Sequence, residues 1–495
     1  MHYLLGLDNG GTMTKAALFD ENGTPVASAS RQTPLSTPSA GREERDMEEL
    51  WQANAACIRE VLERSGIDPG AVAGVGCTGH GKGAYLWGED GPVCPAIAST
   101  DRRAEDIVRR FSADGTAAEV RRRTLQPPIA CQPPLLLRWI KENAPQLLPR
   151  IRHVFSCKDY IRFRLTGEAR SELTDASGTA LLDPAAGQFD PALFALFGIA
   201  ELADRLPPPC GAWERCGTVT EAAARQTGLR PGTPVAGGMF DIDACAVAAG
   251  VTDPDRLCMI TGTWSINEYP SRTPVSDETT RSSLFCLPGY WLIEESSPTS
   301  AGDLEWLLNT CLKAEVAQAR ADGVRFYDRA DALVAALPPQ DSRVVFLPFL
   351  YGSNTAVHDA AFVGLSNAHG SADLLRAVYE GVTYAHRMHL SRLLRFRRPP
   401  AAIRLTGGAA RSAVWVQMFA DVLGLPVEAV GMAQPGALGA AMAAAVAGGI
   451  WPSPQAAVRQ MMPPVRTVLP DPAAAAVYEE KYARYLAVTE RLGGI

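Results

Sequence analysis

The chain begins with a short, largely apolar run that leads directly into an acid, two glycines and a threonine. Residues 3–7 are followed by Asp8, by the Gly-Gly-Thr sequence of residues 10–12, and by a second apolar run over residues 16–19. Because glycine supplies the backbone freedom of a tight turn, this pattern predicts a strand, a turn and a returning strand. Two adjacent glycines also leave backbone N–H groups uncovered, and such a concavity binds phosphate oxygens. We therefore expect a phosphate site at the start of the chain.

The side chains around this turn have the chemistry of a phosphate and metal site. Thr12 and Thr14 add two hydroxyl donors, and Lys15 adds a cation. Asp8, at the end of the first strand, is a natural ligand for the Mg²⁺ that accompanies a nucleotide. The alternative is an ordinary Gly-Gly hairpin with an incidental aspartate, so the rest of the chain has to decide between the two.

Length and composition narrow the class of protein. A chain of 495 residues exceeds one hydrophobic core, which predicts two domains. A net charge of −7 and the absence of a basic run argue against a nucleic-acid partner. Eleven cysteines without Cys-x-x-Cys pairs favour a reducing compartment over a disulfide framework or a zinc site. No signal peptide is visible, and the apolar stretch 437–451 is alanine-rich and too short for a membrane span, so we expect a buried helix and a cytoplasmic protein.

The expected elements are those of an α/β protein, and their order in the first half of the chain is repeated in the second half. A helix over residues 46–65, with Asp46 as its cap, precedes a strand over residues 72–77. Residues 257–265 then repeat the opening scheme of apolar strand, Gly-Thr turn and returning strand. This repeat predicts two similarly built domains, residues 1–245 and 246–495, which face each other across a cleft.

Several short fragments occur in an order that is typical of one family. They are residues 6–12 (Gly-Leu-Asp-Asn-Gly-Gly-Thr), 237–241 (Gly-Gly-Met-Phe-Asp), 261–263 (Thr-Gly-Thr), 347–352, 405–412 and 434–441. With them the chain resembles the FGGY carbohydrate kinases, which belong with actin, hexokinase and the heat-shock chaperone ATPases. The resemblance implies an α/β fold of two actin-like (ribonuclease H-like) domains. It also implies transfer of phosphate from ATP, with Mg²⁺ as cofactor, to a terminal hydroxyl of a sugar.

Other fragments are most like the L-xylulose and 3-keto-L-gulonate kinase branch of that family. They are residues 44–51, 81–83, 99–103 and 297–306. We therefore expect L-xylulose, or a related keto sugar acid, as the acceptor. A kinase for D-xylulose, ribulose or another polyol remains the alternative. The sequence is compatible with a homodimer but does not determine the oligomeric state.

The resemblance also implies roles for individual residues. Asp241 would be the catalytic base that takes the proton of the sugar hydroxyl, and Asp8 would act on the metal side. The residues implied in sugar binding are His80, Lys82, Asp101, Arg102 and Asp241. Those implied in nucleotide binding are Gly10, Gly11, Thr12, Lys15, Thr261, Gly262, Thr263, Gly407, Gly408 and Ala409.

Structural roles compete with some of these assignments. Asp241 could instead cap the helix that follows it, since aspartate is favoured at that position. His80 could be a structural histidine with its hydrogen bonds satisfied, and Gly408 could serve helix–strand packing alone. Asp243 is the second choice for the base.

Two functions of other classes would use the same fold. One is a conformational ATPase like actin or the chaperones, and the other is a sugar sensor without catalysis. Release of ADP in proportion to added sugar would separate the kinase from both.

Overall fold

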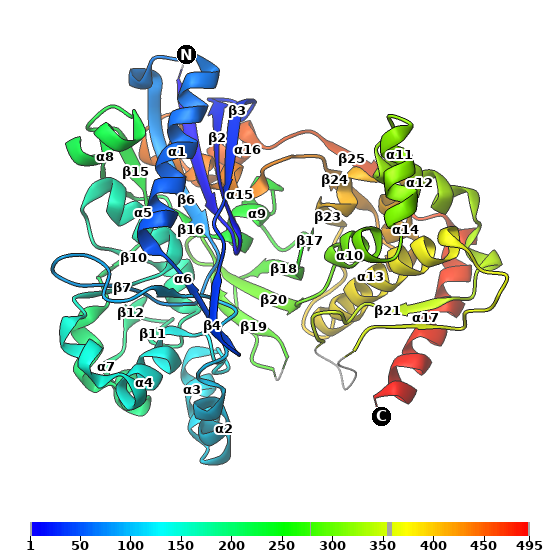
Figure 1. Ribbon diagram of the computed structural model, residues 1–495, viewed down its shortest axis with the longest axis horizontal. Coiled ribbons are helices and arrows are strands. Elements are labelled where there is room, and N and C mark those ends of the chain that lie inside the picture. The colour runs from blue at the N-terminus through cyan, green and yellow to red at the C-terminus, as the bar shows by residue number, and fades with distance from the viewer. Residues whose placement is uncertain (1, 278, 354–358, 494–495) are drawn as a thin grey trace.

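The computed structural model describes residues 2–277, 279–353 and 359–493, which form two lobes, each built on a seven-stranded sheet (Figure 1). The first sheet has the order β14-β15-β6-β1-β2-β3, with β16 paired to β6, and the second has the order β19-β20-β18-β17-β23-β24-β25. In each, a central strand pairs antiparallel with the next strand of a hairpin and parallel with a later one. The two-fold repeat and the α/β class predicted from the sequence are confirmed.

The strands of the first sheet are β1 (Tyr3–Asn9), β2 (Met13–Asp20), β3 (Pro25–Gln32), β6 (Val72–Gly79), β14 (Arg215–Thr218), β15 (Pro234–Ala236) and β16 (Met239–Phe240). Those of the second are β17 (Arg256–Thr261), β18 (Ser265–Ser271), β19 (Arg281–Leu284), β20 (Trp291–Ser297), β23 (Ala402–Gly407), β24 (Val427–Val430) and β25 (Val465–Val468). Short strands outside these sheets are β4 (Ser36–Ser39), β5 (Arg42–Arg45), β7 (Tyr85–Trp87), β8 (Ala96–Ile97), β9 (His153–Phe155), β10 (Ser171–Glu172), β11 (Leu182–Asp183), β12 (Gln188–Phe189), β13 (Pro209–Cys210), β21 (Val345–Leu347) and β22 (Ala361–Val363).

The α-helices up to residue 250 are α1 (Met47–Ser65), α2 (Glu105–Ala113), α3 (Thr116–Thr124), α4 (Pro133–Asn143), α5 (Cys157–Thr166), α6 (Leu173–Ser177), α7 (Pro191–Leu196), α8 (Glu221–Thr227) and α9 (Asp241–Ala248). Those after it are α10 (Gly302–Thr310), α11 (Lys313–Ala321), α12 (Phe326–Ala336), α13 (Ser371–Leu393), α14 (Ala413–Leu423), α15 (Pro435–Ala447), α16 (Pro454–Met461) and α17 (Pro472–Leu492). No helix in the described ranges is long and apolar enough to cross a membrane.

Helix α1 illustrates how local sequence sets an element. The Asp46 side chain accepts from the backbone N–H of Glu49, and Gly66 ends the helix in the left-handed conformation, as is typical of helix termini. Its apolar face, which includes Trp51 and Ile58, packs on the side of the first sheet that presents Leu5 and Leu7. The helix and the cap predicted from the sequence are confirmed.

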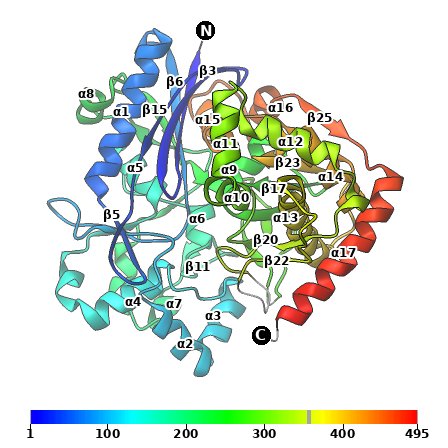
Figure 2. The same ribbon diagram turned by 45° about the vertical axis from the view of Figure 1, so that its right-hand side comes forward.

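The other side of the first sheet is covered by α15, a helix from the second half of the chain, which lies with α9 where the two lobes meet (Figures 1 and 2). Helix α15 lies close to strands β1 and β6 because both strands have glycines on the face that it covers. A Cβ added at Gly6 would lie 1.8 Å from the Ala437 carbonyl oxygen, and one at Gly76 would lie 1.9 Å from that of Ala440. The buried alanine-rich helix predicted from the sequence is thus the element that joins the two cores.

Candidate active site

Two acids meet at the point where β1 ends and α9 begins. Burial raises the pKa of Asp8, and Lys15 on the neighbouring strand opposes that rise. Burial raises the pKa of Asp241 well above its usual value, the carboxyls of Asp8 and Asp175 raise it further, and Lys82 lowers it. A raised carboxyl pKa in a recess between lobes is typical of a general base. The sequence-predicted pair of acids is therefore brought together.

The backbone around Asp241 separates its two predicted roles. Asp241 is the first residue of α9, the capping position belongs to Phe240, and no side chain caps the helix. The alternative role of Asp241 as helix cap is therefore wrong. Asp243, the second choice for the base, is fully buried and accepts from the Cys286 N–H at 2.8 Å, so it ties α9 to the second lobe.

Lys82 lies in a small cavity beside these acids. Its φ of 63° is a left-handed conformation that is uncommon for a side chain of this size, and its Nζ lies 5.3 Å from the centroid of the Phe240 ring. The cavity is lined by Gly81, Lys82, Gln126, Thr174, Asp175, Gly178, Phe240, Ser283 and Glu294. Residues of both halves of the chain thus form its wall.

The second half reaches this cavity through β19 and β20. The Gln126 side chain donates to the Ser282 carbonyl at 2.7 Å, and the Ser177 hydroxyl accepts from the Leu284 N–H at 3.0 Å. Glu294 on β20 faces the same cavity and pairs with Arg281 at 3.5 Å. Any ligand in this cavity would therefore contact both lobes.

Three of the predicted sugar-binding residues are engaged within the protein. His80 is buried, donates from Nδ1 to the Gly81 carbonyl at 3.3 Å and accepts from the Tyr85 hydroxyl at 3.2 Å. Burial and the Arg45 charge lower its pKa to about 4, so it is neutral at physiological pH. These bonds favour the structural alternative, and sugar contact by His80 stays a prediction.

Asp101 and Arg102 lie outside the cavity that Lys82 lines. The Asp101 carboxylate is fully buried and accepts from Arg103 at 2.9 Å and from the Glu43 N–H at 2.8 Å. Arg102 is exposed and pairs with Glu105 at 2.5 Å. In this conformation Asp101 holds a loop and offers no open oxygen to a ligand.

Sequence reasoning missed Asp175, which pairs with a buried lysine of α5. Lys158 is fully buried, and its Nζ lies 2.8 Å from Asp175, 3.1 Å from Asp159 and 3.2 Å from Glu172. The Thr174 hydroxyl accepts from the Phe240 N–H at 2.8 Å and so holds the residue before Asp241. No local signal marks Asp175, because it meets Lys158 only where α6 lies beside α5.

The turn between β1 and β2 was predicted to bind phosphate, and the structure contradicts that prediction at one residue, Thr14. The Thr14 hydroxyl is fully buried, lies 2.9 Å from Asn9 Oδ1 and 3.0 Å from Asn54 Oδ1, and donates its proton to one of these two oxygens. The expectation that Thr14 offers a hydroxyl to phosphate is therefore wrong. Gly11 and Thr12 are exposed, and the guanidinium of Arg45, a residue that the sequence did not single out, bonds to the Gly11 carbonyl.

The equivalent turn of the second sheet opens into a cavity of about 380 Å³. Thr261, Gly262, Thr263 and Gly408 line it, and the Thr261 hydroxyl donates to the Thr406 carbonyl at 2.8 Å. Gly407 has a φ of +92° and packs against Thr261, to whose carbonyl and hydroxyl oxygens the N–H groups of Gly408 and Ala409 donate. This packing accounts for Gly407 but not for Gly408, where an added Cβ would meet no atom nearer than 3.5 Å, so a ligand role for Gly408 stays a prediction.

The far wall of this cavity was not predicted, because it comes from helices without a recognisable motif. Tyr379 of α13 stacks on Trp415 of α14 with ring centroids 4.1 Å apart. The Asp331 carboxylate of α12 accepts from the Tyr379 hydroxyl at 2.8 Å and from the Ser412 hydroxyl at 2.7 Å. A cavity with glycine turns on one side and stacked rings on the other has the shape and chemistry that a nucleotide requires.

The two turns, the acid pair and the two cavities define the class of protein. The FGGY family of carbohydrate kinases matches over almost the whole chain, its N-terminal domain at residues 3–248 and its C-terminal domain at residues 257–448, so the chain belongs to that family. The prediction of a sugar kinase with this two-domain fold is confirmed at the level of the family.

Individual relatives are similar over nearly their full length. The chain is 38% identical to L-xylulose/3-keto-L-gulonate kinase of Escherichia coli K12, covering 99% of this chain and 97% of that protein. It is 38% identical to a probable L-xylulose kinase of Pasteurella multocida, covering 99% of both chains. The crystal structure of xylulose kinase from Rhodospirillum rubrum superposes with a TM-score of 0.87 at 30% identity, covering 99% of both chains.

Proposed function

We propose that this kinase transfers the γ-phosphate of ATP to a terminal hydroxyl of L-xylulose or of a related keto sugar acid such as 3-keto-L-gulonate. The first half, residues 1–245, would bind the sugar, and the second half, residues 246–495, would bind the nucleotide. The observation that carries the proposal is Asp241, a carboxyl whose raised pKa responds to Asp175 and Lys82, two residues that line the cavity. The relatives that are 38% identical carry L-xylulose in their names and support the choice of acceptor.

Asp241 would act as the general base. Its carboxylate accepts the proton as the sugar oxygen attacks phosphorus, a contribution of roughly 10²–10⁴-fold in rate. The raised pKa brings the carboxyl nearer to the operating pH, which makes proton acceptance more favourable. Lys82 opposes the rise in the pKa of Asp241 and so favours the ionised form of the base.

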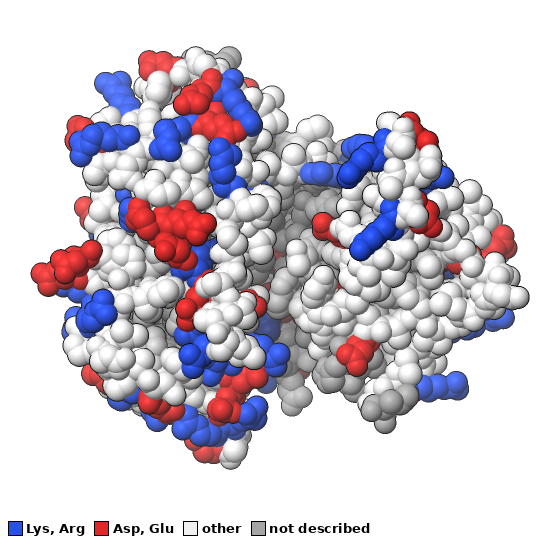
Figure 3. All heavy atoms as spheres, in the orientation of Figure 1, with Lys and Arg blue, Asp and Glu red and all other residues white. Residues whose placement is uncertain are grey.

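Phosphate groups would be held between the two exposed turns. Gly10, Gly11 and Thr12 come from the first lobe, and Gly262 and Thr263 come from the second. The groove between the lobes is visible on the surface (Figure 3). Lys15, opposite Asp8 in the β1–β2 pair, supplies a positive charge beside the acid pair.

Asp8 is the residue proposed on the metal side. Its carboxylate lies at the amino end of α15, where a Cβ added at Gly436 would lie 2.8 Å from Oδ2. Within the described residues no group of three or more His, Cys, Asp or Glu side chains is placed to hold a metal ion. A single carboxylate still fits Mg²⁺, which keeps several waters and binds through one or two carboxylates plus substrate phosphates. When bound, it would neutralise charge on the transferred phosphate.

Lys82 is proposed as the residue that decides between neutral and acidic acceptors. A keto sugar acid brings a carboxylate that requires a nearby cation, and Lys82 lies in the acceptor cavity with two acids, Asp175 and Glu294. Removal of Lys82 would leave a substrate carboxylate facing those acids alone. The Lys82→Met variant should therefore lose roughly 1.5–3 kcal/mol in kcat/KM for the keto acid, and much less for L-xylulose.

The experiment is ADP release by the purified enzyme against a panel of ketoses, polyols and keto sugar acids, with wild type and Lys82→Met compared. One ADP per sugar phosphate, with highest kcat/KM for L-xylulose or 3-keto-L-gulonate, supports the proposal. ADP release that is independent of sugar would instead indicate a conformational ATPase, and equal losses for acid and neutral sugars would remove Lys82 from acid selection.

A further inference from the structure

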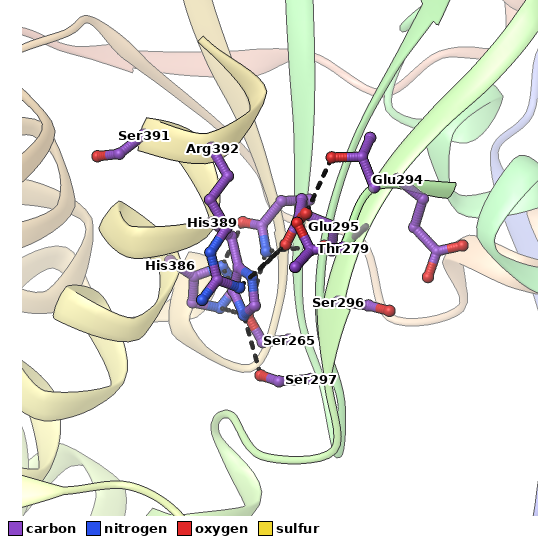
Figure 4. Close-up of polar contacts among 12 residues, drawn as sticks. Ser265, Thr279, Glu294, Glu295, Ser296, Ser297, His386, His389, Ser391 and Arg392 are labelled. Atoms are coloured by element: carbon purple, nitrogen blue, oxygen red, sulfur yellow. Dashed lines mark hydrogen bonds and ion pairs between the residues drawn. The ribbon is translucent and has the colours of Figure 1, made fainter. Parts of the chain in front are cut away.

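A buried polar cluster in the second lobe surrounds His386, a fully buried residue of α13 (Figure 4). His386 Nδ1 lies 2.7 Å from Asn267 Oδ1, and His386 Nε2 lies 3.0 Å from the Ser300 hydroxyl. Ser265 Oγ lies 3.2 Å from each ring nitrogen. The ring thus joins α13, strand β18 and the loop before α10.

The backbone carbonyl of Glu295 determines which atoms in this cluster donate hydrogen bonds and which accept them. Asn267 faces the Glu295 carbonyl at 3.3 Å, and since a carbonyl only accepts, the atom facing it must be the amide NH₂. The Asn267 oxygen therefore points to His386 and requires a donor, which places the imidazole proton on Nδ1. Nε2 is then an acceptor, and the Ser300 hydroxyl donates to it.

The imidazole is neutral, as this pattern demands. Burial, with a smaller contribution from His389, lowers the pKa of His386 to about 3. Its ring packs edge-on against Phe419, with centroids 5.4 Å apart. A neutral ring with one donor and one acceptor therefore occupies a fixed orientation between β18 and Ser300.

Both serines adjoin backbone that lines the 380 Å³ cavity. Ser265 directly follows the turn that contains Gly262 and Thr263, and Ser300 directly precedes Ala301 and Gly302. The two backbone segments lie close together, because a Cβ added at Gly302 would lie 3.8 Å from the Thr263 Cα. The Ser300 carbonyl also accepts from the Asp303 N–H at 3.0 Å in the first turn of α10.

We propose that His386 is a positioning residue for the nucleotide site: it sets the separation between the Gly262–Thr263 turn and the start of α10. The inference rests on the proposed nucleotide site in this cavity. His386 touches no ligand itself. It acts through Ser300 and Ser265, which hold the two segments that would face the phosphates.

His389 provides a matched control one turn further along α13. It is also buried, and its ring bonds to Glu295 at 3.2 Å and to the Ser297 hydroxyl at 3.0 Å (Figure 4). Neither partner lines the cavity. Loss of His389 should therefore lower stability without a specific effect on nucleotide affinity.

The test uses three variants of His386 in the full-length enzyme. His386→Gln can still accept from Ser300, whereas His386→Asn keeps a donor for Asn267 but is too short to reach Ser300. His386→Phe keeps the ring and removes both bonds. KM values for ATP and sugar, kcat, and the affinity for ADP by titration calorimetry are measured for each, with His389→Gln alongside.

We expect His386→Asn and His386→Phe to raise the KM for ATP and the Kd for ADP at least 10-fold, with the KM for sugar within 2-fold. His386→Gln should stay within about 3-fold of wild type for ATP, and His389→Gln should lower the melting temperature without raising the KM for ATP. If His386→Phe does not fold, the comparison of His386→Asn with His386→Gln tests the inference. The inference would be overturned if His386→Asn and His386→Gln had the same KM for ATP. It would also be overturned if His389→Gln raised the KM for ATP as much as His386→Asn does.

A separate variant tests the nucleotide site on which the inference depends. Gly408 is exposed, has an ordinary φ of −62° and has no atom nearer than 3.5 Å to an added Cβ, so Gly408→Asp should fold and place a carboxylate in the cavity. Loss of ADP binding in Gly408→Asp locates the site there. Unchanged binding would overturn the proposed site and this inference together, whereas an effect at Gly408 with none at His386 would overturn the inference alone.

Discussion

At the scale of single residues, the chemistry depends on carboxyls whose ionisation the protein makes costly. Asp241 is half-buried near Asp8 and Asp175, and each of these neighbours raises its pKa. A carboxyl whose pKa is higher in the folded state than in the unfolded chain destabilises the fold at neutral pH, where the unfolded form is ionised. The site therefore holds a reactive base at a cost in stability.

Replacement of Asp241 by asparagine should separate these two effects. We expect Asp241→Asn to lower kcat by about 100-fold or more, since the base is gone while the shape is kept. The melting temperature at pH 7 should stay the same or rise, because a buried acid among acids is removed. A kcat near that of wild type would exclude Asp241 as the base and shift the assignment to Asp243.

The pH dependence of kcat/KM should report on Lys82. Because the base must be ionised, kcat/KM falls as the pH drops through the raised pKa of Asp241. The Lys82 cation lowers that pKa, so Lys82→Met should move the acidic limb to higher pH. Arg109→Gln, which removes an exposed charge paired with Asp106, is the control and should leave the limb in place. A limb unchanged in Lys82→Met would show that the two groups do not interact.

At the scale of elements, the glycines of β1 and β6 leave the space in which α15 packs on the first sheet. A side chain at Gly76 would meet the Ala440 carbonyl at 1.9 Å, and backbone cannot yield as a flexible side chain does. The contact with α15 therefore requires glycine at these positions of both strands.

Gly76→Ala should destabilise the protein by about 1–3 kcal/mol or more, the cost of overpacking a core. Urea unfolding followed by tryptophan fluorescence measures the change. Gly431→Ala is the matched control, since nothing lies within 4 Å of its added Cβ and its φ is ordinary. Equal midpoints for the two variants would contradict the close packing of α15 on the sheet.

The elements that were predictable from sequence are those with local signals. Asp46 and Gly66 mark the ends of α1, and the Gly-Thr turns mark both hairpins. The stacked pair Tyr379–Trp415 carried no such signal, because it forms only where α13 and α14 pack together. Asp175 carried none either, because its partner Lys158 belongs to a different helix. At Asp101 the family resemblance implied a sugar ligand, but the side chain of Arg103, two residues away, pairs with its carboxylate.

At the scale of the whole molecule, the proposed phosphate ligands belong to different lobes. Thr12 comes from the first and Thr263 from the second, with a groove between them (Figure 3). A site assembled from two bodies is complete only when they approach, and closure also excludes water from the transferred phosphate.

Binding of sugar together with a non-hydrolysable ATP analogue should therefore reduce the radius of gyration in small-angle scattering. Either ligand alone should produce a smaller change, because each would contact the facing lobe through fewer groups. A sugar that the enzyme does not phosphorylate serves as the control. No compaction with both ligands bound would contradict the closure model.

The position of α15 has a consequence for how the chain is made. The first sheet needs a cover for the face that presents Gly6 and Gly76, and that cover lies at residues 435–447, after almost the whole second sheet. At about 5–20 residues per second, the ribosome leaves this face open for roughly tens of seconds after β6 has emerged. We expect the nascent first lobe to expose this face until translation is nearly over, because its packing can be completed only after Ala447 has emerged from the ribosome.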